Sequence, residues 1–411
     1  MSLSIDDVRA AAARLHDVAV RTPLERSERL SQLTGAEVWL KREDLQPVRS
    51  YKLRGAYNFI ASLSEAERAR GVVCASAGNH GQGVAFTCRR LGVKGRIVLP
   101  RTTPRQKRER IATLGGDQAE IIVEGHTYDD AHEAAVALAQ AEGATLVPPF
   151  DHPHVVAGQG TVALEVFDQF GGAPDVLLAP VGGGGLLAGT LIVAAGRSRV
   201  VGVEPAGAAS MTAALEAGEP VTLPSIDTFV DGAAVRRVGS FTFEVARRLV
   251  DELVTVPEGR LCTTMLELYQ REGVIAEPAG ALAVAALANG VGVPPGASVV
   301  CIVSGGNNDV SRYGEIIERS LVHEGLKHYF LVEFPQEPGA LRGFLDMVLG
   351  PTDDITLFEY VKKNNRETGP ALVGVELAAT EDLAPLLERM KASPLHIEPV
   401  PSGSPAFRFL V

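Results

Sequence analysis

The sequence predicts an α/β protein with open parallel sheets, followed by a smaller α+β domain. Two observations lead to this prediction. An apolar strand, a glycine-rich loop and a helix recur along the chain, and after Leu321 the pattern changes to alternating apolar and polar residues. At 411 residues the chain is also too long for one ordinary core, so we expect two or three domains.

Three segments share the order of an apolar strand followed by a glycine-rich loop. Their strands and loops lie at residues 71–75 and 76–83, at 176–181 and 182–185, and at 298–303 and 304–308. The first two continue into helices at 84–91 and 186–195 and then into strands at 95–100 and 200–204. Strands without polar alternation, joined by helices, indicate parallel sheets buried on both faces. Ligands bind such sheets beyond the carboxyl ends of the strands, so the three loops can face one site.

The C-terminal segment has the strand and helix order of a ferredoxin-like domain, βαββαβ. We expect strands at 328–334, 355–361, 371–377 and 407–411, with helices at 341–349 and 382–391. The sequence therefore predicts a domain over residues 1–322, a linker near 320–327 and a second domain over residues 327–411.

Composition narrows the class of protein. The formal net charge of −11 argues against nucleic acid or an anionic membrane as the main partner. The basic run at 101–110 contains no aromatic residues and is typical of a solvated helix face. Widely spaced cysteines, with Cys74 and Cys301 in apolar runs, favour reduced thiols in the cytoplasm. Apolar runs are short and interrupted by glycine, and we expect neither a signal peptide nor a membrane span.

Lys52 lies where a helix is expected to begin, with Ser50 as its N-cap. Burial and the positive end of a helix dipole both disfavour the ammonium form of a lysine. An amine must be deprotonated to attack an aldehyde, so both effects favour the reactive form. Taken alone, however, the pattern is more typical of a surface lysine in the first turn of a helix.

The four-glycine turn at 182–185 stands between a strand and a helix, which favours an anion site made of backbone N–H groups. A dinucleotide site is an alternative, because Gly183, Gly185 and Ala188 match the fingerprint of such sites. Glu204 then stands about 20 residues further on, where a ribose-binding carboxylate would lie. A plain structural turn is a third interpretation.

The combination of elements favours the aldehyde-binding interpretation. Asn79, in the loop at 76–83, offers an amide beside glycines that let backbone N–H groups approach a carboxylate. A nicotinamide enzyme has no use for Lys52 near a second loop of this kind. Asp151, His152 and His154 suggest a metal pair, but no third ligand has a suitable spacing, so we predict no metal site.

Across nearly the whole chain the sequence resembles the biosynthetic threonine dehydratases (threonine ammonia-lyases, EC 4.3.1.19). These are fold-type II pyridoxal-phosphate (PLP) enzymes, similar in fold to the tryptophan synthase β subunit. The resemblance is carried by motifs at residues 41–47, 50–56, 76–83, 149–153, 158–161, 182–185 and 304–307. It implies a catalytic domain of two subdomains, the smaller at about 45–150, and an ACT-like regulatory domain at 327–411.

The resemblance also implies roles for matching residues. Lys52 would hold PLP as a Schiff base and remove the substrate Cα proton, and Tyr51 would pack beside the cofactor. Asn79 would bond the ring hydroxyl and Ser304 the pyridine nitrogen. The turn would cradle the phosphate with Gly182, Gly183, Gly184 and Gly185. The substrate carboxylate would be held by the backbone N–H groups of Ser76, Ala77, Gly78, Asn79 and His80.

The implied reaction converts L-threonine to 2-oxobutyrate and ammonia, and L-serine to pyruvate, as the first step of isoleucine biosynthesis. The implied effectors are L-isoleucine as inhibitor and, less strongly, L-valine as antagonist. A homodimer or homotetramer is expected. A serine or diaminopropionate lyase, a dinucleotide-binding oxidoreductase and an inactive amino-acid sensor are the alternatives. The C-terminal domain could also serve assembly without an effector.

Two departures distinguish the chain from serine racemases, which it also resembles. Those enzymes have a serine where this chain has Ala77, so poor racemisation is expected. They also bind a divalent cation through a Glu and an Asp six residues later, whereas Glu204 is followed here by Ser210.

Overall fold

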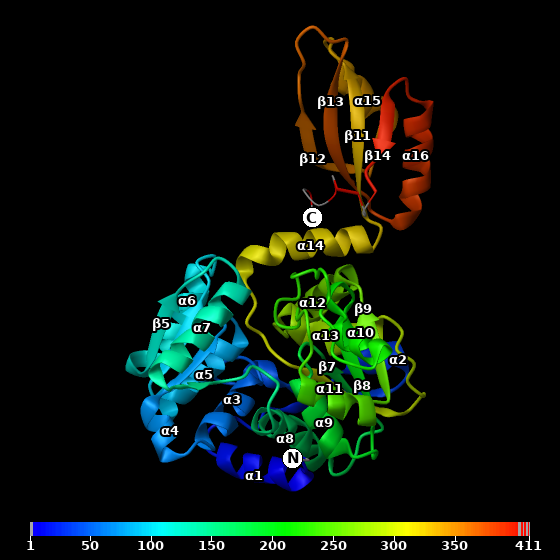
Figure 1. The fold of residues 1–411 in the computed structure, drawn as a ribbon. Coiled ribbons are helices and arrows are strands. Elements are labelled where there is room, and N and C mark those ends of the chain that lie inside the picture. Colours follow the sequence, from blue (N-terminus) through cyan, green and yellow to red (C-terminus); the bar gives the residue numbers. More distant parts are fainter. Residues whose placement is uncertain (1–2, 402–403, 406, 408–409, 411) are drawn as a thin grey trace. The chain divides into compact units, whose positions relative to one another are not determined.

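The computed structural model describes residues 3–401, 404–405, 407 and 410. The chain divides into two compact units between Asn308 and Asp309 (Figure 1). This division lies earlier than the linker expected at 320–327, because the helix before that linker clusters with the second unit. No helix in the described part of the chain is both long and apolar enough to cross a membrane.

The larger sheet of the first unit has six strands in the order β1-β2-β10-β7-β8-β9. All neighbours are parallel except the edge strand β1, which runs antiparallel to β2. The strands are β1 (Leu24–Arg26), β2 (Glu37–Arg42), β7 (Val176–Pro180), β8 (Arg199–Pro205), β9 (Glu252–Val256) and β10 (Ser298–Val303).

The smaller sheet of the first unit is entirely parallel, in the order β5-β4-β3-β6. Its strands are β3 (Val72–Ala75), β4 (Gly95–Leu99), β5 (Ala119–Val123) and β6 (Thr145–Leu146). Cys74 and Ile97 pack into one apolar cluster with α3, α5 and α6, whereas Val73 and Val98 pack into another with α7. Because successive side chains of a strand point to opposite faces, this sheet is covered on both sides.

Thirteen helices of the described residues accompany these sheets. They are α1 (Ile5–Leu15), α2 (Glu28–Thr34), α3 (Lys52–Ala61), α4 (Glu65–Arg70), α5 (Asn79–Leu91), α6 (Arg105–Gly115), α7 (Tyr128–Glu142), α8 (Pro153–Phe170), α9 (Gly185–Ala194), α10 (Ser210–Ala217), α11 (Ser240–Leu249), α12 (Glu258–Glu272) and α13 (Pro278–Ala288). Short 3-10 helices are η1 (Glu43–Leu45), η2 (Gly116–Gln118) and η3 (Ala206–Ala208).

The larger sheet is also buried on both faces. Val300 and Ile302 of β10 belong to a core cluster with residues of α1, α8 and α9, whereas Cys301 Sγ donates to Ala283 O of α13 at 3.7 Å. This explains why the strands are apolar without alternation, as the parallel-sheet prediction requires. The three glycine-rich loops follow β3, β7 and β10 at their carboxyl ends.

The second unit contains a four-stranded antiparallel sheet in the order β12-β13-β11-β14. Its elements are η4 (Val310–Arg312), α14 (Tyr313–His323), β11 (Lys327–Pro335), α15 (Ala340–Val348), β12 (Asp354–Tyr360), β13 (Thr368–Glu376), η5 (Thr380–Asp382), α16 (Leu383–Ala392) and β14 (His396–Pro399). From β11 onward the order is βαββαβ, so the ferredoxin-like prediction is confirmed. Its core is built from Phe330, Val332, Phe334 and Phe344 with their neighbours.

The fourth described strand of the second unit lies earlier in the chain than the strand predicted at 407–411. The strand expected at 407–411 falls largely on residues outside the described part of the chain, and the fourth described strand is β14. Its side chains are mostly exposed, with Ile397 alone half-buried and packed on the core. A strand at the edge of the sheet with one apolar residue has no clear alternation, so its pattern did not reveal it.

Helix α14 is fastened to the sheet of the second unit at Glu318. One carboxylate oxygen accepts from Lys327 Nζ at 2.6 Å, and the other accepts from the Tyr329 hydroxyl. Lys327 and Tyr329 belong to β11, so this carboxylate joins the helix to one of the two central strands of the sheet. The contact explains why α14 clusters with the second unit rather than acting as a linker.

Candidate active site around Lys52

Lys52 is the first residue of α3, as its sequence context predicted. Its Nζ donates to Pro149 O at 3.3 Å and lies 5.5 Å from the centre of the Tyr51 ring. Burial lowers the pKa of Lys52 to about 8, although the carboxyl of Glu277 opposes the shift. A substantial fraction of this amine is therefore neutral near pH 8, which is the form that attacks an aldehyde.

Ser50 is not the N-cap of α3, contrary to the sequence prediction. Tyr51 takes that place and makes no side-chain capping bond. Ser50 instead pairs with Gly305 in an isolated antiparallel bridge, and Tyr51 N donates to Ser304 O at 3.1 Å. The residues before the helix are thus tied to the loop after β10, which brings Ser304 beside the segment that carries Lys52.

Helix α3 is held by close contact with α8. Gly55 N in its first turn donates to the side-chain oxygen of Gln159 at 3.1 Å, in place of a local cap. At Gly158 an added Cβ would lie 2.5 Å from Arg54 O, so only glycine allows the two backbones to approach this closely. The position of Lys52 is therefore determined by α8, more than a hundred residues away in sequence.

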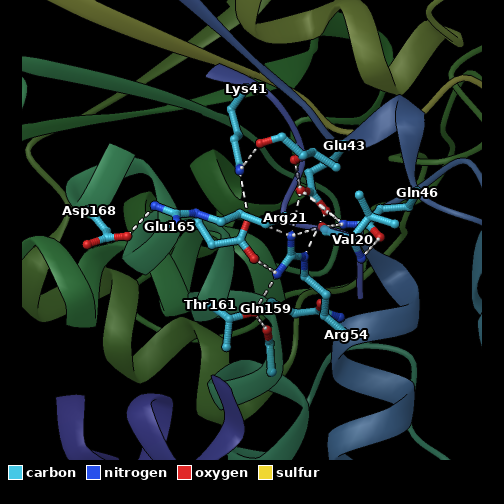
Figure 2. Close-up of polar contacts among 12 residues, drawn as sticks. Val20, Arg21, Lys41, Glu43, Gln46, Arg54, Gln159, Thr161, Glu165 and Asp168 are labelled. Atoms are coloured by element: carbon cyan, nitrogen blue, oxygen red, sulfur yellow. Dashed lines mark hydrogen bonds and ion pairs between the residues drawn. The ribbon is translucent and has the colours of Figure 1, made fainter. Parts of the chain in front are cut away.

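A buried network of charges, which includes Glu165 of α8, also fixes α3 (Figure 2). The guanidinium of Arg54 contacts the carboxylates of Glu43 and Glu165 at 2.7–2.8 Å, and Lys41 Nζ donates to Glu165 at 2.7 Å. Two cations face two anions, so the cluster has no net charge. Burial alone would raise the pKa of Glu43, but Arg54 brings it below its usual value.

Asn79 is the first residue of α5 and faces the loop after β10. Its Nδ2 donates to Glu277 Oε1 at 2.5 Å, and its Oδ1 accepts from Asn307 Nδ2 at 2.7 Å. Glu277 Oε2 in turn accepts from Asn307 N at 3.1 Å. Two of the three predicted loops therefore meet through one ring of hydrogen bonds.

Glu277 was missed by the sequence reading. Burial raises its pKa to about 7, Asp231 adds to the shift, and the bonds from Asn79 and Asn307 oppose it. The available clue was a Glu directly before Pro278 at the start of a helix, where a capping residue is expected. That pattern indicates a helix terminus, and it contains nothing that points to Lys52 or Asn79.

The loop proposed for a carboxylate ends at the N-terminus of α5. Ser76 Oγ accepts from Gly78 N at 3.2 Å, and Gly78 is the N-cap. The side chain of His80 is buried, with Nε2 at 3.0 Å from Val147 O. Burial and the nearby Lys52 lower the pKa of His80 to about 3, so the ring is neutral at pH 7 and Nε2–H donates to that carbonyl. Ala77 packs against the core of the smaller sheet.

The four-glycine turn joins β7 to α9, as predicted. Gly184 is the N-cap with φ of 90°, a conformation that favours glycine, and Gly185 begins the helix. The first intrahelical bond runs from Ala188 N to Gly184 O at 2.8 Å, so the preceding N–H groups have no carbonyl four residues back. Such a terminus fits an anion, and a cofactor phosphate is an anion of suitable size.

The turn is connected to the other parts of the site. A Cβ on Gly183 would lie 2.3 Å from the ring of Phe150, so this ring lies against the glycine backbone. Gly182 lies against the backbone of Ala233, and a Cβ on the neighbouring Gly232 would be 3.6 Å from Glu277 Oε1. Ser304, at the end of β10, is buried and its Oγ donates to Ala279 O at 3.3 Å.

The residues that suggested other ligands have structural partners. Both carboxylate oxygens of Glu204 accept backbone N–H groups of α10, from Met211 at 2.6 Å and Thr212 at 2.9 Å, so they are not directed at a ribose. His152 Nδ1 accepts from His154 N at the start of α8. Among the described residues, no group of three or more His, Cys, Asp or Glu side chains could hold a metal ion.

Comparison with known proteins agrees with this fold. The chain matches the family of pyridoxal-phosphate dependent enzymes over residues 16–305 and the C-terminal regulatory domain of threonine dehydratase over 318–410. It is 60% identical to the biosynthetic L-threonine dehydratase of Mycobacterium tuberculosis, over 100% of this chain and 96% of that one. For the Bacillus subtilis relative the identity is 50%, over 100% and 98%. The structure of processed threonine deaminase isoform 2 from Solanum lycopersicum gives a TM-score of 0.73 at 40% identity, over 77% and 92%.

Proposed function

The chain belongs to the biosynthetic threonine dehydratases, a family of PLP-dependent enzymes, and we propose that its site around Lys52 deaminates L-threonine to 2-oxobutyrate and ammonia. The same site is proposed to convert L-serine to pyruvate. The observation that carries this assignment is the buried amine of Lys52, with its pKa lowered to about 8, which donates to Pro149 O beside the residue that lies against the four-glycine turn.

The residues present fit the cofactor. The N-terminus of α9 offers N–H groups to a phosphate, and we assign that role to Gly182, Gly183, Gly184 and Gly185. Tyr51 lies beside the amine, and Ser304 offers a hydroxyl for the pyridine nitrogen. When bound, PLP supplies an electron sink for the bond electrons at the substrate α-carbon. Because a hydroxyl does not keep the pyridine protonated as a carboxylate would, Ser304 favours prompt elimination over transamination.

Asn79 is proposed to bind the ring oxygen of the cofactor. Its carbonyl oxygen is occupied by Asn307 and one of its N–H groups by Glu277. These two partners determine which end of the amide is the donor, and they leave the second N–H for the ring oxygen. Glu277 and Asn307 therefore act as positioning residues for Asn79.

Lys52 is proposed to bind the cofactor and then to remove the Cα proton of the substrate. Its lowered pKa supports both roles, because each requires the neutral amine. The backbone N–H groups of residues 76–80, namely Ser76, Ala77, Gly78, Asn79 and His80, are proposed to hold the substrate carboxylate. The start of α5 supports this assignment, since the positive end of the helix dipole favours an anion there.

We further propose that the second unit binds L-isoleucine as a feedback inhibitor. The resemblance supports L-valine as an antagonist less strongly. The chain contains one ferredoxin-like unit, so an effector site built from paired units would take its second unit from another subunit. A dimer or tetramer is proposed on this ground.

The test is keto-acid release from L-threonine and from L-serine by the full-length protein, with and without L-isoleucine. We expect activity on threonine that isoleucine suppresses. A Lys52→Ala variant should lose both the activity and the absorbance of the bound cofactor. If neither substrate yields a keto acid, the assignment is refuted. If the activity does not respond to isoleucine, only the regulatory part is refuted.

A further inference from the structure

Asp151 connects two elements of the site that are far apart in sequence. Its Oδ2 accepts from Ser240 N at 2.9 Å, and its Oδ1 accepts from Phe241 N at 2.9 Å and Thr242 N at 3.2 Å. These are N–H groups of the first turn of α11, which have no partners within the helix. The N-cap of α11 is Gly239, which has no side chain with which to cap the helix locally.

The approach of Asp151 depends on that glycine. A Cβ at position 239 would lie 2.2 Å from Asp151 Oδ1. The carboxylate therefore occupies the place of a local capping side chain, and it brings its own segment, residues 149–151, to the helix. Its negative charge also lies at the positive end of the helix dipole, which favours this arrangement.

The N-terminal residues of α11 also bind the four-glycine turn at 182–185. Thr242 is fully buried, and its hydroxyl donates to Gly183 O at 2.7 Å. The carbonyl of Gly183 and the N–H of Gly184 belong to one planar trans peptide, in which these groups point in opposite directions. By holding the carbonyl toward α11, Thr242 directs the Gly184 N–H away from α11.

We propose that Asp151 and Thr242 are positioning residues for the cofactor phosphate: Asp151 fixes the start of α11, and Thr242 fixes the peptide whose N–H binds the phosphate. This rests on the proposed assignment of the four-glycine turn to that phosphate. The proposal assigns neither side chain a contact with the cofactor. Asp151 is thereby given a role that is neither catalytic nor metal-binding.

The inference is tested by comparing the affinity for PLP with the affinity for pyridoxal, which lacks the phosphate. Apoprotein of each variant is titrated with either compound, and binding is followed by absorbance. In an Asp151→Asn variant the side-chain NH2 would replace the oxygen that accepts from Ser240 N. Two donors would then face each other, and that hydrogen bond would be lost. We expect the dissociation constant for PLP to rise about tenfold or more, and that for pyridoxal to change less than about twofold.

Asp175→Asn is the matched control. Asp175 is also a carboxylate that accepts a backbone N–H, from Ser298 at 2.8 Å. It precedes β7, however, and so lies at the amino end of the strand whose carboxyl end leads into the four-glycine turn. This control should leave the preference for PLP over pyridoxal unchanged. If Asp151→Asn does not fold, Thr242→Val carries the test, since it removes the hydroxyl at nearly constant volume. Thr242→Ser should restore the preference for PLP.

Two results would overturn the inference. Equal weakening of PLP and pyridoxal in the Asp151 and Thr242 variants would indicate a general structural role, and unchanged PLP affinity would indicate none. A different result concerns the premise: if the unaltered protein binds PLP and pyridoxal equally well, the four-glycine turn is not the phosphate site. In that case the proposed assignment fails first, and the inference fails with it.

Discussion

Asn307 Nδ2 donates to Asn79 Oδ1 at 2.7 Å, which joins the loop after β10 to the first residue of α5. The bond connects the two sheets of the first unit at the side where both have their carboxyl ends. The Asn79 amide N–H in turn donates to Glu277, a carboxyl of raised pKa that acts electrostatically on Lys52.

The pH dependence of cofactor uptake should reflect Lys52. The pKa of this amine is lowered by burial from 10.5 to about 8, and only the neutral form attacks the aldehyde. The rate of PLP incorporation into apoprotein should therefore rise with pH around a midpoint near 8. Stopped-flow absorbance across a pH series measures it. In Glu277→Gln the opposing carboxylate is gone, so the midpoint should move to lower pH; an upward move would contradict this account.

Removing Arg54 should destabilise the protein strongly. Arg54→Met leaves the carboxyl of Glu43 fully buried without its main partner, and breaking such a buried pair costs about 3–5 kcal/mol. The matched control is Arg21→Met, which breaks the exposed pair with Asp168 shown in Figure 2 and should cost less than about 1 kcal/mol. Urea denaturation measures both. Similar losses in the two variants would show that the buried network does not hold α3.

A methyl group at position 158 should displace the helix that carries Lys52. Gly158→Ala places a Cβ 2.5 Å from Arg54 O, so α3 and α8 must separate, at a cost of about 1–3 kcal/mol. We expect a lower kcat for threonine as well as a lower melting temperature. Gly172→Ala is the control, because no atom lies within 4 Å of its added Cβ. Unchanged kcat in Gly158→Ala would mean that the spacing of these helices does not set the position of the amine.

The attachment of α14 to its sheet should matter for regulation. Glu318→Gln weakens the bonds from Lys327 and Tyr329, while the chain between Asn308 and β11 still runs through this helix. If isoleucine acts through the second unit, its half-inhibitory concentration should rise several-fold, with activity in its absence unchanged. Glu388→Gln, which breaks an exposed pair with Lys391, is the control. Equal inhibition of the unaltered protein and Glu318→Gln would disprove the coupling.

The three glycine-rich loops could be predicted from the sequence for a physical reason. Each follows an apolar strand without alternation, and parallel strands bring their carboxyl ends to one edge. Lys52 and Asn79 stand out within or near these loops. The ferredoxin-like order of the second unit was equally evident, since alternation and turns are local properties of the chain.

Other parts of the site could not be predicted because their roles arise from distant partners. Glu277 lies 198 residues from Asn79, and Gln159 lies 104 residues from Gly55. Nothing local distinguishes such side chains from an ordinary helix cap or an ordinary buried amide. Ser50 was misassigned for the same reason, because its bridge to Gly305 displaces the local capping that its position suggests.

Three successive residues, Pro149, Phe150 and Asp151, each serve a different partner: the Lys52 amine, the four-glycine turn and the start of α11. Their spacing along the backbone matches the spacing of those partners. Inserting or deleting a single residue here would displace all three contacts together, whereas a substitution affects one of them. In this segment the number of residues therefore matters more for the three contacts than the identity of any one side chain.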